Sequence, residues 1–225
     1  GVFTADPRII KSAKLIDEIT YDEMLEMSSS GAGVLMARSV EFGRRYNVPI
    51  IVKSTFTNNK GTVVKEKTME EAIVSGVTHN DKEVKFTLFG VPDQPGIAGT
   101  VFGSLSEIGT NVDMIVQNVS KESITDISFT APSEQQKDVE DTLKNISKQL
   151  DAKGYDVDEN IARISIIGAG MKSESGVASK MFKTLGDNKI NISMISTSPI
   201  RVSCVISSND IEKALNVLHE EFITN

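Results

Sequence analysis

Residues 96–115 read GIAGTVFGSLSEIGTNVDMI, and a related stretch, GVASKMFKTLGDNKINISMI, follows about 80 positions later at residues 176–195. Glycine, alanine, phenylalanine, leucine, asparagine, methionine and isoleucine recur in the same order in both stretches. Chance does not align so many unlike residue types, and self-similarity at a fixed period indicates a repeated structural unit. The sequence therefore predicts two copies of one fold in this part of the chain.

Each copy is expected to run strand, loop, helix, strand, strand, helix. In the first copy, the apolar residues of 96–108 recur at the spacing of one helix face, and residues 85–90, 112–119 and 124–131 have strand composition. In the second copy, we expect strands at 163–168, 192–198 and 201–207 and helices near 175–187 and 210–222. This order predicts an α/β (α+β) fold with an antiparallel sheet and both helices on one face.

The fourth strand of each sheet is less evident. A βαββαβ unit needs a strand after its second helix, and the first copy offers a weak one at 155–161, whereas the second copy ends at Asn225 without room for it. Residues 70–79 have strand character and precede the first copy. Because an open edge on a buried sheet is a liability, we expect this segment to complete the second sheet.

Two helix starts carry the pattern of a capping box, in which two side chains cap each other's backbone N–H groups. Thr20 with Glu23 is one such pair, and Ser133 with Gln136 is the other. Both are expected to have a structural role.

Composition and charge exclude several classes of function. A formal net charge of -7 argues against a nucleic-acid or anionic-membrane surface. One cysteine, Cys204, excludes an internal disulfide and favours the cytoplasm, and two distant histidines predict no metal site. No apolar run approaches the ~20 residues of a membrane span. Because the chain starts at Gly1 and not at Met, we expect it to be part of a longer protein.

The loop at residues 90–102, GVPDQPGIAGTVF, leads from a strand into a helix. N–H groups in the first turn of a helix have no intrahelical partner and attract anions, and Gly96 allows a ligand to approach closely. The loop therefore suits a small anion at the helix start. The alternative is that Asp93 and Pro95 only form a turn and a cap, and the residues alone leave both open.

Longer motifs resemble a known family. PDQPGIAGTVFGSLSEIGTNVDMIVQN, GAGMKSESGVASKMF and NISMISTSPIRVSCVI are similar to the tandem ACT domains of aspartokinases, and GVFTADPRI with the segment LIDEITYDEMLEM resembles the end of their amino-acid-kinase domain. The resemblance implies two ferredoxin-like βαββαβ ACT domains packed as a pair, preceded by the C-terminal piece of a kinase domain. The implied boundaries are 1–68 for the kinase piece, 81–161 for the first ACT domain and 162–225 for the second, completed by 70–79.

The resemblance also implies that this strand–loop–helix junction binds the main chain of a free amino acid, with its carboxylate on the N–H groups after Pro95 and its ammonium at Asp93 or Asp113. It further implies a set of positions that bind this effector. In the first module they are Asp93, Gly96, Ile97, Ala98, Asn111, Val112, Asp113 and Gln117, and in the second Val177, Ala178, Asn191, Ile192, Ser198 and Pro199. Relatives often carry glutamate where Pro199 stands, so the partner of a lysine side-chain ammonium is left open. Ser120 and Ser128 match secondary positions at which substitutions relieve inhibition in relatives.

For the nucleotide, the resemblance implies that Phe3 covers the adenine, that Arg8 approaches phosphate, and that Gly33 and Val34 form a second contact. Many relatives carry lysine at the position of Gly33, which weakens that contact, and an ordinary structural arginine is the alternative for Arg8. ATP with Mg²⁺ is implied for the full-length enzyme. The chain lacks the family's N-terminal lysine- and glycine-rich motif, so we expect no catalytic residue, no cofactor and no kinase activity in this chain alone.

The implied function is the regulatory region of an aspartokinase. It binds lysine, threonine or both and controls ATP-dependent phosphorylation of L-aspartate to 4-phospho-L-aspartate, in lysine, threonine and methionine biosynthesis. A homodimer or higher homo-oligomer through the ACT domains is implied. One alternative is a regulatory subunit without catalysis, started at Met69, against which residues 1–68 argue. The other is a stand-alone amino-acid sensor, for example a transcriptional one, which is disfavoured because no helix-turn-helix is visible and GVFTADPR would be unexplained.

Overall fold

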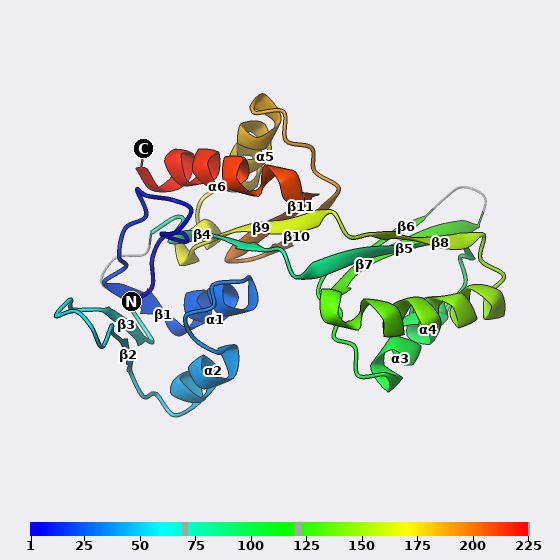
Figure 1. The fold of residues 1–225 in the computed structure, drawn as a ribbon, viewed down its shortest axis with the longest axis horizontal. Helices are drawn as coiled ribbons and strands as arrows, with labels where there is room; N and C mark the ends of the chain where they lie inside the picture. The colour runs from blue at the N-terminus through cyan, green and yellow to red at the C-terminus, as the bar shows by residue number, and fades with distance from the viewer. Residues whose placement is uncertain (69–71, 120–122, 225) are drawn as a thin grey trace. The chain divides into compact units, whose positions relative to one another are not determined.

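A computed structural model describes residues 1–68, 72–119 and 123–224 (Figure 1). Met69, Ser120 and the first two positions of the strand expected at 70–79 lie outside the described residues. The chain forms two compact units, one of residues Asp81–Ile161 and the other of Gly1–Asn80 together with Ala162–Asn225. No helix among the described residues is long and apolar enough to cross a membrane.

The unit Asp81–Ile161 is a four-stranded antiparallel sheet with two helices on one face, in the order β6-β7-β5-β8 (Figure 1). Its elements in chain order are β5 (Glu83–Pro92), α3 (Ile97–Glu107), β6 (Ile115–Val119), β7 (Ile124–Pro132), a 3-10 turn (Ser133–Gln135), α4 (Gln136–Gln149) and β8 (Gly154–Asp158). The predicted ferredoxin-like fold of the first module is confirmed.

The core of this unit lies between the sheet and its two helices. Phe86 of β5 stacks on Phe129 of β7 with ring centroids 5.3 Å apart, and Phe102 of α3 meets Phe129 edge-on at 5.7 Å. Val101 and Leu105 on α3 and Leu143 on α4 are fully buried against these rings. The apolar face of each helix is therefore the face that the sequence periodicity predicts.

The second ACT sheet has the same architecture in the order β10-β11-β9-β4. It contains β4 (Gly76–Asn80), β9 (Ile161–Ile167), α5 (Val177–Asp187), β10 (Met194–Ser198), β11 (Arg201–Ser207) and α6 (Ile211–His219), with 3-10 turns at Ala169–Lys172 and Ser208–Asp210 and a π-helical turn at Glu220–Thr224. β4 pairs antiparallel with β9, with Thr78 opposite Ser165. Part of the segment expected at 70–79 thus lies in the second sheet, although 85 residues separate His79 from Ile164 in sequence.

The kinase-like part consists of β1 (Glu18–Thr20), α1 (Tyr21–Ser29), α2 (Ala37–Arg45), β2 (Ile50–Val52) and β3 (Thr62–Lys65), with a small sheet in the order β1-β3-β2. Its core is formed by Met24 and Met27 of α1, Val40 of α2 and Val64 of β3, and Ile167 of β9 joins them. On the other face of β9, Ile164 and Ile166 pack into the core under α5 and α6. The kinase-like part and the second ACT module therefore share one folded body.

The two predicted capping boxes have different outcomes. At α1 the prediction is confirmed, because Thr20 Oγ1 accepts from the Glu23 N–H and Glu23 Oε2 accepts from the Thr20 N–H. At α4 it is wrong, because Ser133 starts a 3-10 turn and Gln136 is already the first residue of the helix, which has no side-chain cap. The 3-10 turn tightens the helix start and supplies backbone partners in place of the box.

Candidate functional site

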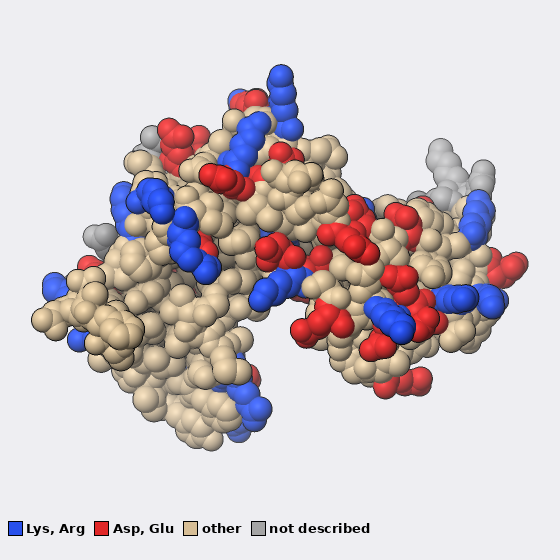
Figure 2. Space-filling model, in the orientation of Figure 1, with Lys and Arg blue, Asp and Glu red and all other residues tan. Residues whose placement is uncertain are grey.

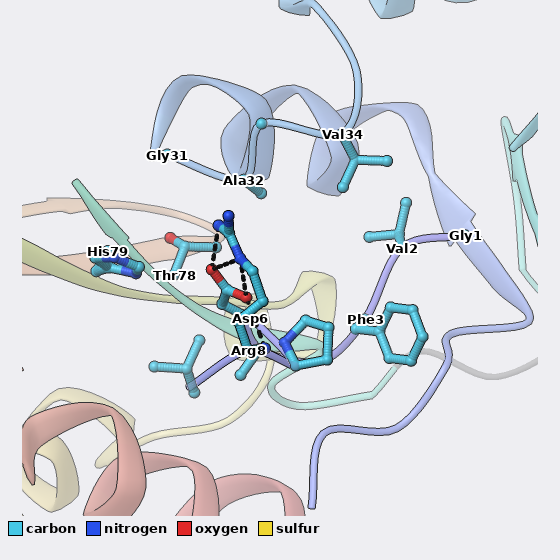
Figure 3. A pocket seen from close by; sticks show the side chains of 14 residues that line it. Gly1, Val2, Phe3, Asp6, Arg8, Gly31, Ala32, Val34, Thr78 and His79 are labelled. Atoms are coloured by element: carbon cyan, nitrogen blue, oxygen red, sulfur yellow. Dashed lines mark hydrogen bonds and ion pairs between the residues drawn. The ribbon is translucent and has the colours of Figure 1, made fainter. Parts of the chain in front are cut away.

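A cavity of about 390 Å³ lies at the N-terminal segment of the chain (Figure 3). Phe3, Arg8, Gly33 and Val34, which the sequence assigns to the nucleotide, all line it. The N-terminal segment forms one wall and the loop after α1 another, and Thr78 and His79 of β4 line it too, so the second ACT sheet contributes to the same cavity.

Arg8 and Asp6, which both line this cavity, form a two-pronged ion pair, and the Arg8 side chain is 88% exposed. Arg8 Nε donates to Asp6 Oδ1 at 3.0 Å and Nη2 donates to Oδ2 at 2.6 Å (Figure 3). The hydrogen bond from Arg8 lowers the pKa of the Asp6 carboxyl, and the same bond raises the pKa of Arg8. Asp6 therefore orients the guanidinium and offsets its charge, leaving Nη1 for another acceptor.

Both walls of the cavity are fixed by ACT elements. The Val77 N–H of β4 donates to the Thr4 carbonyl at 2.8 Å, and Thr4 Oγ1 lies 2.9 Å from His219 Nε2 of α6. Gly31 has a φ of +103°, and a Cβ added there would lie 1.9 Å from the His79 carbonyl oxygen. Only glycine allows this close approach, which clamps the 31–34 loop against β4.

The chemistry of the cavity suits a nucleotide, with one weakness. Phe3 offers an aromatic ring, and Gly33 has open space where a Cβ would stand. Among the described lining residues, Arg8 is the single Lys or Arg side chain, and Asp6 already holds two of its nitrogens. A bound phosphate would therefore meet less positive charge in this cavity than it would if position 33 carried a lysine.

A second feature is the start of helices α3 and α5. The residue before each helix is a glycine in the left-handed region, Gly96 with φ 96° and Gly176 with φ 89°. Neither helix has a side-chain cap or an acidic residue in its first turn, whereas α1 is capped by Thr20 and Glu23. Both glycines face open space. The Ile97 N–H of α3 already donates to the Gln94 carbonyl at 3.3 Å. The other first-turn N–H groups of α3 and those of α5 receive no side-chain cap, so an anion from outside the helix can bind them.

At α5 the helix start opens into a cavity of about 410 Å³. It brings together four positions that the sequence assigns to the effector, which are Val177, Ala178, Ser198 and Pro199. Sequence reasoning missed Lys172 and Glu174, two charged side chains that line the same cavity. Their signal was available, because both lie in the charged loop that precedes Gly176.

The remaining effector positions do not converge with these within one module. Asp93, Gly96, Ile97 and Ala98 follow the end of β5, whereas Asn111, Val112 and Asp113 precede the start of β6. β5 and β6 both run antiparallel to β7, so the two groups lie at opposite ends of the sheet, and Gln117 lies midway, level with Leu88. In the second module, Asn191 and Ile192 precede β10 and lie at the end opposite Ser198.

Sequence reasoning also missed three residues that line the cavity at the N-terminal segment: Asp6, Thr78 and His79. Asp6 stands two positions before Arg8, a spacing from which the ion pair could have been inferred. Thr78 and His79 had no local sequence signal, because they reach the cavity lined by Phe3 and Arg8 from a strand of another module. The secondary position Ser128 has its hydroxyl 3.0 Å from that of Thr87 on the neighbouring strand.

Family models match three stretches of the chain. Residues 1–54 match the amino acid kinase family, and residues 85–151 and 164–222 each match an ACT domain. These stretches coincide with the kinase-like part and the two ferredoxin-like modules.

The aspartate kinase of Pseudomonas fluorescens (strain SBW25) is 45% identical to this chain over 225 residues, which is 99% of this chain and 54% of that protein. The aspartokinase of Helicobacter pylori (strain 26695) is 44% identical, over 97% of this chain and 55% of that protein. The chain thus spans about half the length of the curated relatives it matches.

Solved structures of aspartate kinases are also similar to this chain. The regulatory subunit of aspartate kinase from Thermus thermophilus is 35% identical with a TM-score of 0.64, over 67% of this chain and 99% of that one. Aspartokinase III of E. coli is 25% identical to this chain. Its structure in complex with aspartate and ADP matches with a TM-score of 0.85, and its structure in complex with lysine and aspartate matches with a TM-score of 0.77. Each match covers 50% of that chain. The order of the modules, their folds and these relatives show that the chain belongs to the aspartokinase family.

Proposed function

We propose that this chain is the regulatory region of an aspartokinase joined to the C-terminal part of its kinase domain, and that it acts in the cytoplasm. Lysine, threonine or both bind to the ACT modules and control ATP-dependent phosphorylation of L-aspartate to 4-phospho-L-aspartate. The functional segments are 1–68 for the kinase part, 81–161 for the first ACT domain and 162–225 with its added strand for the second.

The observation that carries the proposal is the pair of uncapped helix starts at Gly96 and Gly176. Helix α2 also lacks a side-chain cap, but among the described α-helices a left-handed glycine with open space around it precedes only α3 and α5. An α-carboxylate satisfies the N–H groups of such a helix start and gains roughly 0.3–1 kcal/mol from the helix dipole. In the second module, Glu174 supplies the acidic side chain that Pro199 does not, so a side-chain ammonium has a partner in the same cavity.

The division of the effector positions supports a homodimer. A carboxylate at Gly96–Ala98 and an ammonium at Asp113 cannot share one small amino acid within a single module, because these residues lie at opposite ends of the sheet. A second copy of the chain can bring its Asn111–Asp113 segment to the helix start of the first. A ligand that bridges two copies binds the dimer better than the monomer, so it shifts the equilibrium toward dimer.

ATP with Mg²⁺ is the substrate complex of the full-length enzyme in this proposal, and Phe3, Arg8, Gly33 and Val34 are its contacts from this chain. The related E. coli enzyme was solved with ADP. Large apolar side chains are exposed on the kinase-like part, and the remainder of an amino-acid-kinase domain would cover them: Val34, Met36, Phe42, Tyr46, Val48, Ile51 and Phe56. Without that remainder, we expect no transfer of phosphate.

A regulatory subunit without catalysis is the second candidate. It is favoured by the regulatory subunit of Thermus thermophilus, of which 99% is covered by 67% of this chain. Residues 1–54 match the amino acid kinase family and would be unexplained in such a subunit. The first candidate therefore accounts for more of the chain.

Calorimetric titration with lysine, threonine and their mixture tests the proposal. Replacing Asp113 with alanine should weaken the binding of the effector at least tenfold, or ~1.4 kcal/mol, if it pairs with the ammonium. The matched control is Asp141→Ala, which removes the same charge from the exposed face of α4 and should leave affinity unchanged. Absence of binding to the unaltered chain, or equal affinity in both variants, would contradict the respective parts of the proposal.

Sedimentation with and without each amino acid tests the dimer. A typical allosteric coupling of about 1–3 kcal/mol corresponds to a 5–150-fold tighter dimer. A monomer at every concentration, insensitive to both amino acids, would contradict the bridging arrangement.

A further inference from the structure

Helix α1 lies between the nucleotide cavity and the cavity at the start of α5. At its C-terminal end it leads into the Gly31–Val34 loop, which lines the nucleotide cavity. Along its side, Leu25, Glu26 and Ser29 line a third cavity of about 490 Å³ together with Ser198 and Pro199, which also line the cavity at α5. Helix α1 therefore lines the third cavity, which shares Ser198 and Pro199 with the cavity at α5, and the loop that follows α1 lines the nucleotide cavity.

Glu26 is the residue of α1 that contacts the turn between β10 and β11. Its Oε2 lies 2.9 Å from Arg201 Nη1, and its Oε1 accepts from Ser198 Oγ at 3.3 Å. The Arg201 and Glu26 side chains are only 14% and 23% exposed, so water screens this ion pair less than it screens a surface pair. Ser198 is itself a wall of the cavity at α5.

Two further contacts hold α1 to the second ACT module on the same side. Glu23 Oε1 accepts from the Ala169 N–H at 3.0 Å, and the buried Arg163 of β9 donates to the Ser29 carbonyl at 3.0 Å. Positions 23, 26 and 29 are three residues apart and lie along one face of a helix. Met24 and Met27 occupy the other face and pack in the kinase-like core.

This arrangement leaves α1 little freedom to move without the loop that follows it. Gly31 is pressed on the His79 carbonyl with no space for a Cβ, so a shift of α1 must be taken up by the 31–34 loop. Of the three contacts, the one at Glu26 involves a residue that an amino acid at α5 would touch. A ligand that reorients Ser198 or Pro199 therefore changes the partner of Glu26 directly.

We propose that Arg201 and Glu26 are positioning residues through which an amino acid bound at Ser198 and Pro199 acts on the nucleotide cavity, with α1 as the connecting element. The inference rests on the proposed function, because it assigns the route of regulation for that same cavity. A ligand that favours one arrangement of the turn shifts the population of one arrangement of the 31–34 loop.

Hydrogen exchange of the whole chain, measured by mass spectrometry, tests the route without any ligand. Arg201→Gln and Glu26→Gln should each speed amide exchange in residues 26–34 by about tenfold, because α1 loses its hold on the turn. The matched control, Lys65→Gln, breaks the ion pair between Lys65 and Glu18, which joins β3 to β1 away from the turn, and should change exchange in 26–34 less than about twofold. The charge-reversed double variant, Glu26→Arg with Arg201→Glu, should restore slow exchange, which a role confined to packing would not predict.

The second arm adds saturating lysine or threonine. In the unaltered chain, the amino acid should change exchange at 31–34, and in Arg201→Gln this change should be lost while calorimetry still shows binding. An equal change in both proteins, or unaltered ligand-free exchange in Arg201→Gln, overturns the inference. Absence of binding to the unaltered chain overturns the proposed function and the coupling with it, and the ligand-free arm then still decides whether the ion pair holds α1.

Discussion

The two ACT modules have the same sheet but obtain its fourth strand differently. In the first module β8 follows α4 directly, so all four strands and both helices lie within Asp81–Ile161. In the second, β4 comes from a segment that precedes the whole first module. Each central pair of strands carries a hydroxyl pair, Thr87 with Ser128 and Ser165 with Ser203, which shows how closely the repeat is kept.

The surroundings of the two sheets differ as well. Every residue of β9 is buried, because α5 and α6 cover one face and the kinase-like part covers the other. In β5, the corresponding strand of the first module, Phe89 remains 38% exposed. Figure 2 shows many acidic side chains over α3 and α4 and a largely uncharged surface over β2 and β3. The first module is thus self-contained, whereas the second depends on the kinase-like part for a strand and for cover.

The largest expected effect follows from this dependence. Fragment 81–161 should fold alone, because it loses no strand, whereas 162–225 should be unfolded, because it loses β4 and the buried side chains of Ala5, Ile10, Val74 and Val77 from its core. Circular dichroism and NMR spectra of the two fragments check this. A cooperatively folded 162–225 fragment would remove the distinction between the modules.

Two glycines at corresponding strand ends sharpen the comparison. A Cβ at Gly168, after β9, would lie 2.2 Å from the Ile73 carbonyl oxygen, which belongs to the backbone that leads into β4. A Cβ at Gly90 in β5 would meet the flexible Lys153 side chain at 2.5 Å, with a φ of +63°. Urea denaturation should show that Gly168→Ala destabilises its unit by about 3 kcal/mol or more and Gly90→Ala by about 1–2 kcal/mol. Equal losses would mean that β4 moves aside easily.

Glu23 should have an intermediate effect. It is 3% exposed and its carboxylate accepts from the Thr20 N–H, Thr20 Oγ1, Ser75 Oγ and the Ala169 N–H. Glu23→Gln turns one acceptor into a donor that faces other donors, and should lower the free energy of unfolding by about 2–3 kcal/mol. Glu134→Gln, at an exposed position of the 3-10 turn before α4 in the first module, is the control and should change the free energy of unfolding by less than about 0.5 kcal/mol. A similar result for both variants would contradict the bridging role of Glu23.

The smallest effect concerns pH. Burial, with a smaller contribution from Lys14, lowers the pKa of His219, so the folded chain binds fewer protons there than the unfolded chain. The stability from neutral His219 is fully present above the unfolded pKa near 6.5 and is lost as pH falls from there toward the folded pKa, at no more than about 1.4 kcal/mol per pH unit. Unfolding of the unaltered chain and of His219→Gln at pH 7.5 and 5.5 measures it. Fragment 81–161 contains no histidine and should lack this contribution, and an identical pH dependence in the variant would exclude His219 as its source.

The sequence predicted most of the fold, and the residues that it assigns to a nucleotide lie together in one cavity. The repeat and the missing fourth strand were enough to associate the 70–79 segment with the second sheet, because they depend on patterns within the chain. The nucleotide positions converge in one cavity, although Phe3 and Val34 are far apart in sequence. The contacts of Glu26 with Arg201 and of Thr4 with His219 could not be predicted, because they depend on how distant elements pack.

The predicted effector positions, in contrast, do not lie together within one module. They were transferred as one set, yet strand direction places Asp93 and Asp113 at opposite ends of the first sheet. This separation follows from the predicted order of strands alone, since a strand, a crossing helix and a parallel strand put the start of the second strand far from the end of the first. The direction of each predicted strand was enough to show that one module cannot bring all the predicted effector positions together.

The insertion of one module between β4 and β9 also has a consequence for folding. Pairing Asn80 with Arg163 closes a long loop of chain, and such non-local contacts form slowly in an unfolded chain. In the first module, however, Lys85 pairs with Asp158, only five residues from each of those positions. Once the first module has folded, the long loop is reduced to two short connections, and β4 and β9 meet as readily as the strands of a hairpin. During synthesis the first module is complete before β9 emerges. The folded module then connects β4 to β9 in the way that a turn connects the two strands of a hairpin.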